Sequence, residues 1–240
     1  MTLKVLCDAY DAMERAKGPD ELRVEMQKFA RQMGFEHYTY ALLVNAPALK
    51  PQQYIINGFP QKWLERYLAN GYLKVDPLIG HAQRSTLPAI WSDEIFHDGK
   101  AEEFWAEAYA YGLQAGLTFA VHDQPGMTGI FSLGRDQALD LKPTDLAALV
   151  GRAQMFASLL HQAVTRIAVP ALLPEQAGSL TTRERECIKW AAEGKTAWEI
   201  GQILNITERT AVFHLNNVTQ KLGAANKTQA IVRAVALKLL

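Results

Sequence analysis

The chain has 240 residues, of which 49% are hydrophobic, so it can bury a core as one large domain or two of ordinary size. Lysine and arginine together number 25, as do aspartate and glutamate, and this balance argues against DNA binding by bulk positive charge. No apolar run is long enough to span a membrane, and the first residues lack the apolar core and cleavage site of a signal peptide.

Ten elements are predicted before residue 168. In chain order they are two amphipathic helices within 3–33, strands at 37–44 and 53–57, helices at 59–71, 76–84 and 102–112, strands at 117–122 and 129–135, and a long helix from about 143 to 167. Gly18-Pro19 separates the first two helices, and Pro60 is expected in the first turn of the third. Because neighbouring strands are joined by short loops or by helices, an antiparallel or mixed sheet flanked by helices is favoured.

A linker is predicted at residues 169–179, which contain Pro170, Pro174 and Gly178 and show no periodicity. From Glu175 onward, nine basic residues face six acidic ones, so this part carries a charge of +3 and the rest carries −3. The predicted domains are therefore 1–168 and 180–240, joined by the linker.

The second domain shows the pattern of a helix-turn-helix. Thr181 with Glu184, and Thr196 with Glu199, have the spacing of capping boxes and predict two helix starts. Asn205 suits a tight turn, after which Thr207 can cap a third helix. That helix buries one face, made of Ala211, Leu215, Val218 and Leu222. The predicted fold class is thus α+β: an N-terminal α/β/α sandwich with an antiparallel sheet, then an all-α helix-turn-helix domain.

The opposite face of the third helix stays free for base edges and phosphates. Arg209 and Lys221 suit phosphate or guanine, and His214 or Thr210 suits backbone phosphate. Phe213 either meets a thymine methyl group or closes against the first helix of the domain. The alternative for each residue is a solvated helix face. The candidate DNA-binding residues are Thr196, Arg209, Thr210, Phe213, His214, Asn216, Asn217, Gln220 and Lys221.

LTTRERECIKWAAEGKTAWEIGQILNITERTAVFHLNNVTQKLGAANKTQAI resembles the DNA-binding domain of LuxR-type regulators over nearly all of residues 180–235. The sequence departs from the family pattern at Ile188, where Leu is usual, and at Ala211-Val212, where Val is followed by a polar or basic residue. The apolar last helix is expected to contact a second copy of the chain, because helix-turn-helix proteins commonly bind DNA as symmetric dimers. The implied partners are double-stranded DNA, a second copy of the chain and RNA polymerase.

FPQKWLERY, VDPLIG, PAIWSD and LQAGLTFAVH resemble the acyl-homoserine lactone binding domain of quorum-sensing LuxR-type receptors. The resemblance covers most of residues 20–165, and it places Pro77 and Gly116 at signature positions. It implies a cytoplasmic regulator of transcription in quorum sensing, of which an activator is one kind. The implied ligand is an N-acyl homoserine lactone. The candidate ligand-binding residues are Phe59, Trp63, Tyr67, Asp76, Trp91 and Ser132.

Donors and acceptors of these types suit such a ligand, which has an apolar tail, an amide and a lactone carbonyl. The Trp63 indole can donate to the lactone carbonyl, Asp76 can accept from the amide N–H, and Ser132 can donate to the amide oxygen. Phe59 stands where many relatives have a Tyr, so Ser132 holds that oxygen alone or with a water. Taken singly, the aromatic residues are typical of an ordinary core. Asp76 before Pro77 is by itself typical of a helix N-cap.

Other functions are less well supported. The six histidines show no HExxH or HxxxH spacing, and the chain has no GxSxG or P-loop, so no catalytic residue, metal site or cofactor is expected. Two isolated cysteines, Cys7 and Cys187, suggest a reducing compartment, with one long-range disulfide left open. A regulator of another small amphipathic ligand, or one controlled by a partner protein, stays an alternative. Tail length, target promoter and the choice between activator and repressor cannot be read from the sequence.

Overall fold

The computed structural model describes residues 3–45, 51–97, 99–124, 126–172, 180–237 and 239–240. The chain forms two compact units. The first consists of residues 1–43, 53–123 and 128–167, and the second of residues 44–52, 124–127 and 168–240. The predicted α+β fold class is confirmed, with a sheet and its covering helices in the first unit and four helices in the second.

The first unit is built on one five-stranded antiparallel sheet, in the order β2-β1-β5-β4-β3. Its strands are β1 (His37–Val44), β2 (Gln52–Asn57), β3 (Ala89–Ile90), β4 (Ala115–Gln124) and β5 (Met127–Arg135). Four of them match predicted strands. β3 was not predicted, because two residues carry no periodicity; it pairs antiparallel with β4, with Ala89 opposite Thr118.

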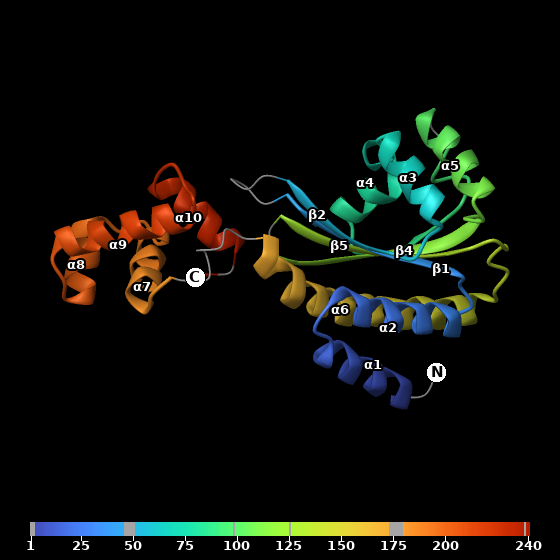
Figure 1. Cartoon of the computed structure of the whole chain (residues 1–240), viewed down its shortest axis with the longest axis horizontal. Helices are drawn as coiled ribbons and strands as arrows, with labels where there is room; N and C mark the ends of the chain where they lie inside the picture. Colours follow the sequence, from blue (N-terminus) through green and yellow to red (C-terminus); the bar gives the residue numbers. More distant parts are fainter. Residues whose placement is uncertain (1–2, 46–50, 98, 125, 173–179, 238) are drawn as a thin grey trace. The chain divides into compact units, whose positions relative to one another are not determined.

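Helices cover both faces of the sheet, so the unit has three layers (Figure 1). One outer layer consists of α3 (Gln61–Ala69), α4 (Pro77–Arg84) and α5 (Lys100–Ala110), with a short 3-10 helix η1 (Tyr72–Lys74) between the first two. The other consists of α2 (Pro19–Gln32) and α6 (Pro143–Leu172), with α1 (Leu3–Arg15) packed against α2. The predicted sandwich is confirmed.

Alternation along β1 divides its side chains between the two layers, as expected for a strand. Thr39, Ala41 and Leu43 point toward the α3–α5 layer, where they line a cavity. Tyr40 points the other way, toward α6, where it contacts His161. The sheet therefore separates two layers: the α3–α5 layer, which holds this cavity, and the layer of α2 and α6, which we call the filled layer.

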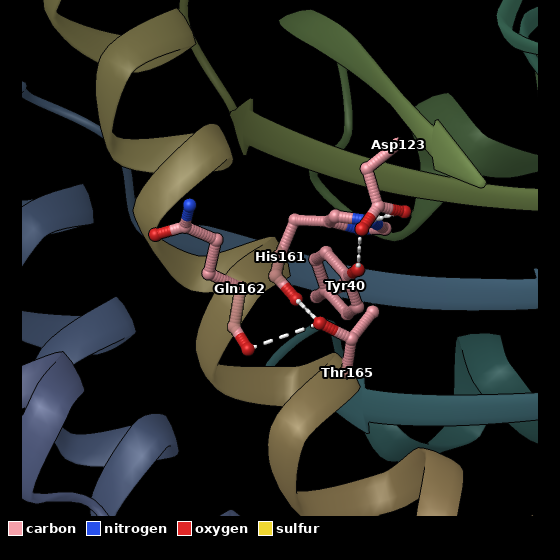
Figure 2. A network of polar contacts seen from close by, with 5 residues as sticks. All are labelled: Tyr40, Asp123, His161, Gln162 and Thr165. Atoms are coloured by element: carbon pink, nitrogen blue, oxygen red, sulfur yellow. Dashed lines mark hydrogen bonds and ion pairs between the residues drawn. The ribbon is translucent and has the colours of Figure 1, made fainter. Parts of the chain in front are cut away.

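The filled layer holds an aromatic core and a buried polar network. Phe29 of α2 stacks on Phe156 of α6 with ring centroids 3.9 Å apart. Beside them, the two ring nitrogens of His161 lie 2.6 Å from the Tyr40 hydroxyl and 2.7 Å from an Asp123 carboxylate oxygen (Figure 2). The polar atoms of this three-residue network are thus paired within the protein rather than offered to a ligand.

Two details of the predicted boundaries were wrong. Pro60 is the N-cap of α3 rather than a first-turn residue. The helix α6 runs to Leu172, so residues 169–172 of the predicted linker are helical and Pro170 lies inside the helix. A proline in a last turn removes only one intrahelical hydrogen bond, and the helix ends two residues later. The rest of the predicted linker lies outside the described residues, as does the side chain of Cys7; Cys187 is a buried free thiol.

The second unit contains four helices: α7 (Thr182–Ala192), α8 (Ala197–Leu204), α9 (Glu208–Lys221) and α10 (Lys227–Ala236). Both predicted capping boxes are present, and Asn205 adopts the left-handed conformation with φ of 54° at the turn between α8 and α9. Gly201 allows that turn to close, because a Cβ there would lie 2.8 Å from the Ile206 carbonyl oxygen. These features fix the helix-turn-helix geometry.

Candidate functional site

A cavity of about 100 Å³ lies between the sheet and the α3–α5 layer. We call it the sheet cavity. Well-packed interiors hold few voids larger than one water molecule, so a void of this size is a site rather than a packing defect. Its lining is mostly apolar, and all six predicted ligand residues belong to it: Phe59, Trp63, Tyr67, Asp76, Trp91 and Ser132.

Apolar side chains that were not singled out from the sequence complete the lining. Leu64 and Leu68 come from α3, the helix that carries Trp63, and Ile130 comes from β5. Leu68 and Leu73, which also line the sheet cavity, are partly exposed to solvent. Periodicity alone could not find these residues, because ordinary core leucines show the same pattern.

One end of the sheet cavity has a wall of aromatic rings. Trp63 is buried between Tyr72, Phe104 and Tyr111, with ring centroids 5.5–6.0 Å apart. Within the described part of the chain, no acceptor contacts the Trp63 indole nitrogen. Because buried donors are normally paired, this N–H is available to a molecule in the cavity.

Asp76 supplies the main acceptor of the sheet cavity. One carboxylate oxygen accepts from the Leu78 backbone N–H at 2.9 Å, which makes Asp76 the N-cap of α4, and the other accepts from the Tyr67 hydroxyl at 3.0 Å. Burial raises the pKa of Asp76 to about 6, although these two hydrogen bonds work in the opposite direction. The Ile79 backbone N–H also lowers this pKa by hydrogen bonding, and of the roughly four acceptor positions of a carboxylate one is left for a further donor, so the N-cap and ligand-binding interpretations are compatible.

Ser132 reaches the sheet cavity from β5, and a buried chain of hydrogen bonds lies behind it. The Trp91 indole N–H donates to the Thr118 hydroxyl at 2.9 Å, and the Thr118 and Ser132 hydroxyl oxygens are 2.9 Å apart. Thr118 was missed by sequence reasoning. The available signal was its position in LTFAVH, two residues after Gly116 and therefore on the same face of β4.

Phe59 packs edge-on against Trp91, with ring centroids 6.3 Å apart. Its backbone is held by Asn57, whose side chain donates to the Phe59 carbonyl at 3.0 Å and accepts from the Phe59 N–H at 3.2 Å. The phenyl ring thus sits firmly at the cavity but brings no hydroxyl. Ser132 lacks a tyrosine partner at this position.

In the second unit, α9 carries the predicted DNA-binding face. Arg209, Phe213, Asn216 and Gln220 are exposed, whereas Thr210, His214 and Asn217 are half-buried. Thr196 caps α8 and holds Glu199, and Thr210 bonds to the cap residue Thr207. Phe213 is 59% exposed and touches His214, so it does not close against α7. Of its two predicted arrangements, the structure has the outward one.

Lys221 differs from its expected role. Its ammonium group lies 2.7 Å from Glu184 of α7, whose carboxylate is only 3% exposed. Burial by itself would raise the pKa of Glu184, but hydrogen bonds from Lys221 and Thr181 outweigh it and lower the pKa. Lys221 therefore joins two helices of the unit, and its charge is already used within the protein. Sequence spacing could not reveal a partner 37 positions away.

The described residues lack two further kinds of site. No group of three or more His, Cys, Asp or Glu side chains there could hold a metal ion. Nor does that part of the chain contain a helix long and apolar enough to cross a membrane.

Two family models match the chain. The autoinducer binding domain matches residues 18–164, and the model for bacterial regulatory proteins of the luxR family matches residues 178–234. The sheet cavity lies within the first match and α9 within the second. Together they cover nearly all of the described residues.

Curated proteins and solved structures resemble the whole chain. The transcriptional activator protein SolR of Ralstonia nicotianae is 38% identical over 233 residues, which are 97% of this chain and 98% of SolR. The quorum-sensing regulator RhlR of Pseudomonas aeruginosa is 34% identical, with 90% and 88% covered. A structure of SdiA in complex with octanoyl-rac-glycerol superposes with a TM-score of 0.81 at 26% identity, covering 98% of this chain and 94% of SdiA.

Proposed function

This chain belongs to the LuxR family of bacterial transcriptional regulators, and from that premise we propose that its ligand is an N-acyl homoserine lactone bound in the sheet cavity. The family and its curated members regulate transcription and are not enzymes. We further propose that the liganded chain acts in the cytoplasm as a dimer, that it binds a palindromic promoter element, and that it contacts RNA polymerase there.

The observation that carries the ligand proposal is the shared cavity of Trp63 and Asp76. An acyl homoserine lactone offers one amide N–H, two carbonyl acceptors and a long apolar tail. The unpaired Trp63 indole suits the lactone carbonyl, the Asp76 carboxylate suits the amide N–H, and Ser132 suits the amide oxygen. The apolar lining from Leu64, Leu68 and Ile130 suits the tail.

A second candidate is a different amphipathic molecule with a carbonyl between its head and tail. It is favoured by the SdiA structure with octanoyl-rac-glycerol and by the missing hydroxyl at Phe59. One lost hydrogen bond costs about 0.5–1.5 kcal/mol, which weakens head-group recognition without abolishing it. Lactone and glyceride must therefore be tested side by side.

The DNA proposal rests on the outward face of α9. Arg209, Asn216 and Gln220 are exposed, polar and suited to phosphates and base edges. The exposed Val235 of α10 suits packing against a second copy, because a symmetric dimer presents two recognition helices to two half-sites. We assign no DNA contact to Lys221, whose ammonium group pairs with Glu184.

Ligand binding and DNA binding are linked through stability in this proposal. Apolar side chains line the sheet cavity, and a bound tail supplies them with packing partners. A ligand that binds only the folded state adds about 2.7 kcal/mol at a hundredfold excess over its dissociation constant. That gain favours the folded chain and hence the dimer.

The test is to purify the chain without ligand and measure its melting temperature and its affinity for palindromic DNA. Lactones with short, medium and long tails, and 1-octanoyl glycerol, are then added separately. We expect at least one lactone to raise both the melting temperature and the DNA affinity, and Asp76→Asn to reduce the response. A response to the glyceride alone would replace the lactone by the second candidate, and no response to any probe would overturn both.

A further inference from the structure

Three buried side chains form a hydrogen-bond chain that leads to the sheet cavity. Trp91 lies at the end of β3, Thr118 in β4 and Ser132 in β5, and each contact in the chain is 2.9 Å. Thr118 is 1% exposed and does not line the cavity, whereas Ser132 is 7% exposed and does. The hydrogen-bond chain thus begins at Trp91 on the cavity wall, passes through Thr118 behind the wall and ends at Ser132 on its surface.

The donor and acceptor capacities of the three groups fix the direction of this hydrogen-bond chain. An indole N–H only donates, so the Thr118 oxygen must accept from Trp91. If Ser132 also donated to Thr118, the Thr118 proton would need another acceptor, and the described residues contact this hydroxyl only through Trp91 and Ser132. The arrangement that pairs every buried proton has Thr118 donating to Ser132. The proton of Ser132 is then left for the cavity.

The backbone holds the first member of the chain in place. The Trp91 N–H donates to the Gly116 carbonyl at 2.9 Å, and the indole ring lies against Gly116 itself. A Cβ at Gly116 would be 2.6 Å from the ring carbon Cδ2 of Trp91. Gly116 therefore lets the indole ring lie directly against β4, two residues from Thr118.

We propose that Thr118 is a positioning residue that fixes the Ser132 hydroxyl as a donor, so that the cavity selects a ligand with a carbonyl oxygen at this point. The proposal deepens the proposed function, on which it rests, because it names the residue that sets the polarity of one contact. The hydrogen-bond chain donates only toward the cavity, so it favours a ligand with an acceptor at this point over a ligand with a donor.

A double-mutant cycle tests this proposal. The dissociation constant is measured for the wild type, Thr118→Val, Ser132→Ala and the double variant, with N-octanoyl homoserine lactone and with 1-octanoyl glycerol, both of which carry the carbonyl. We expect each single change to weaken binding by about two- to tenfold, which corresponds to one hydrogen bond. The double variant is expected to bind no more weakly than the weaker single variant, because both changes remove the same contact.

Thr118→Ser is the matched variant, because it keeps the hydroxyl and is expected to bind like the wild type. The carbonyl stretch of bound, carbon-13 labelled ligand gives a second readout. Loss of the donated hydrogen bond moves this stretch to higher frequency in Thr118→Val and not in Thr118→Ser. If Thr118→Val fails to fold, Trp91→Phe removes the first donor of the chain and should move the stretch in the same direction.

The outcomes separate the two proposals. Coupled losses and a shifted stretch support the role of Thr118 with whichever probe binds. Additive losses, or an unshifted stretch in Thr118→Val, overturn it. Binding of the glyceride alone overturns the lactone proposal and leaves the same cycle to decide on Thr118. Binding of neither probe overturns both, since Ser132 then has no carbonyl to meet.

Discussion

The Tyr67 hydroxyl donates to Asp76 across 3.0 Å inside the sheet cavity, on the side of the carboxylate away from its N-cap contact with Leu78. The two contacts stabilise the charged form, yet burial outweighs them and the pKa of Asp76 rises to about 6. A carboxyl poised in this range changes its charge close to neutral pH. A ligand that donates to Asp76 would favour the charged form.

Lactone affinity should fall as the pH drops below 6. The ligand needs ionised Asp76, and its binding therefore expels the proton that the carboxyl holds at low pH. With a pKa of about 6, affinity is expected to drop roughly tenfold between pH 7 and pH 5. Calorimetric titration at a series of pH values measures this, with Asp76→Asn as the control whose affinity should stay flat. Equal slopes in both proteins would contradict the role of Asp76.

The same shift has the opposite sign for the empty protein. The folded-state pKa of Asp76 lies above the ordinary value of 3.8, so its stabilising contribution is full below that value and is lost as the pH rises through about 6. We expect the ligand-free melting temperature of Asp76→Asn to depend less on pH between 4 and 7 than that of the wild type. A larger dependence in the variant would exclude this assignment.

Replacing Lys221 should damage the second unit itself. Lys221→Ala leaves the buried Glu184 carboxylate without its cation, and leaving a buried acceptor without its partner costs about 1–3 kcal/mol. Urea unfolding followed by circular dichroism should show this loss. Arg209→Ala is the matched control, because Arg209 is exposed: it should weaken DNA binding and leave the unfolding midpoint unchanged. An unchanged midpoint in Lys221→Ala would disprove the structural role.

Gly129→Ala should break the polar network of the filled layer (Figure 2). A Cβ at Gly129 would lie 2.6 Å from the Tyr40 hydroxyl and collide with the His161 ring. Separating Tyr40 from His161 is expected to cost about 1–3 kcal/mol. Gly151→Ala serves as the control, because nothing lies within 4 Å of a Cβ there and an alanine in α6 should add about 0.5–1 kcal/mol. Both values come from thermal or urea unfolding.

Phe213 should contact a thymine methyl group in each DNA half-site. It is exposed at the centre of the outward face of α9, where a phenyl ring in water needs an apolar partner. Replacing thymine by deoxyuridine in each half-site position removes one methyl, worth about 0.8 kcal/mol or roughly fourfold in affinity. We expect one such position to weaken binding of the wild type and to have no effect on Phe213→Ala. Equal losses in both proteins would place Phe213 away from the bases.

Local patterns explain why most of the fold could be predicted. The capping boxes at Thr181 and Thr196 involve residues three positions apart, so the sequence contains the whole motif. The alternation in residues 37–44 likewise predicts a strand by itself. The family resemblance around Trp63 and Asp76 identified six of the residues that line the sheet cavity.

Contacts between distant residues explain what the sequence left open. The two residues of β3 form a strand only because β4 offers its edge. Pro170 predicts a helix end, yet α6 continues past it to Leu172, because a proline in the last turn removes only one intrahelical hydrogen bond. Lys221 and Thr118 have roles that depend on partners in other elements, Glu184 and Ser132. No local pattern encodes such pairs.

The most direct measurement is a crystal structure of the protein grown with a lactone that saturates it in solution. The account predicts density for one molecule in the sheet cavity, with the lactone carbonyl at the Trp63 indole nitrogen and the amide N–H at Asp76. An empty cavity in a saturated protein, or a lactone bound elsewhere on the chain, would contradict it.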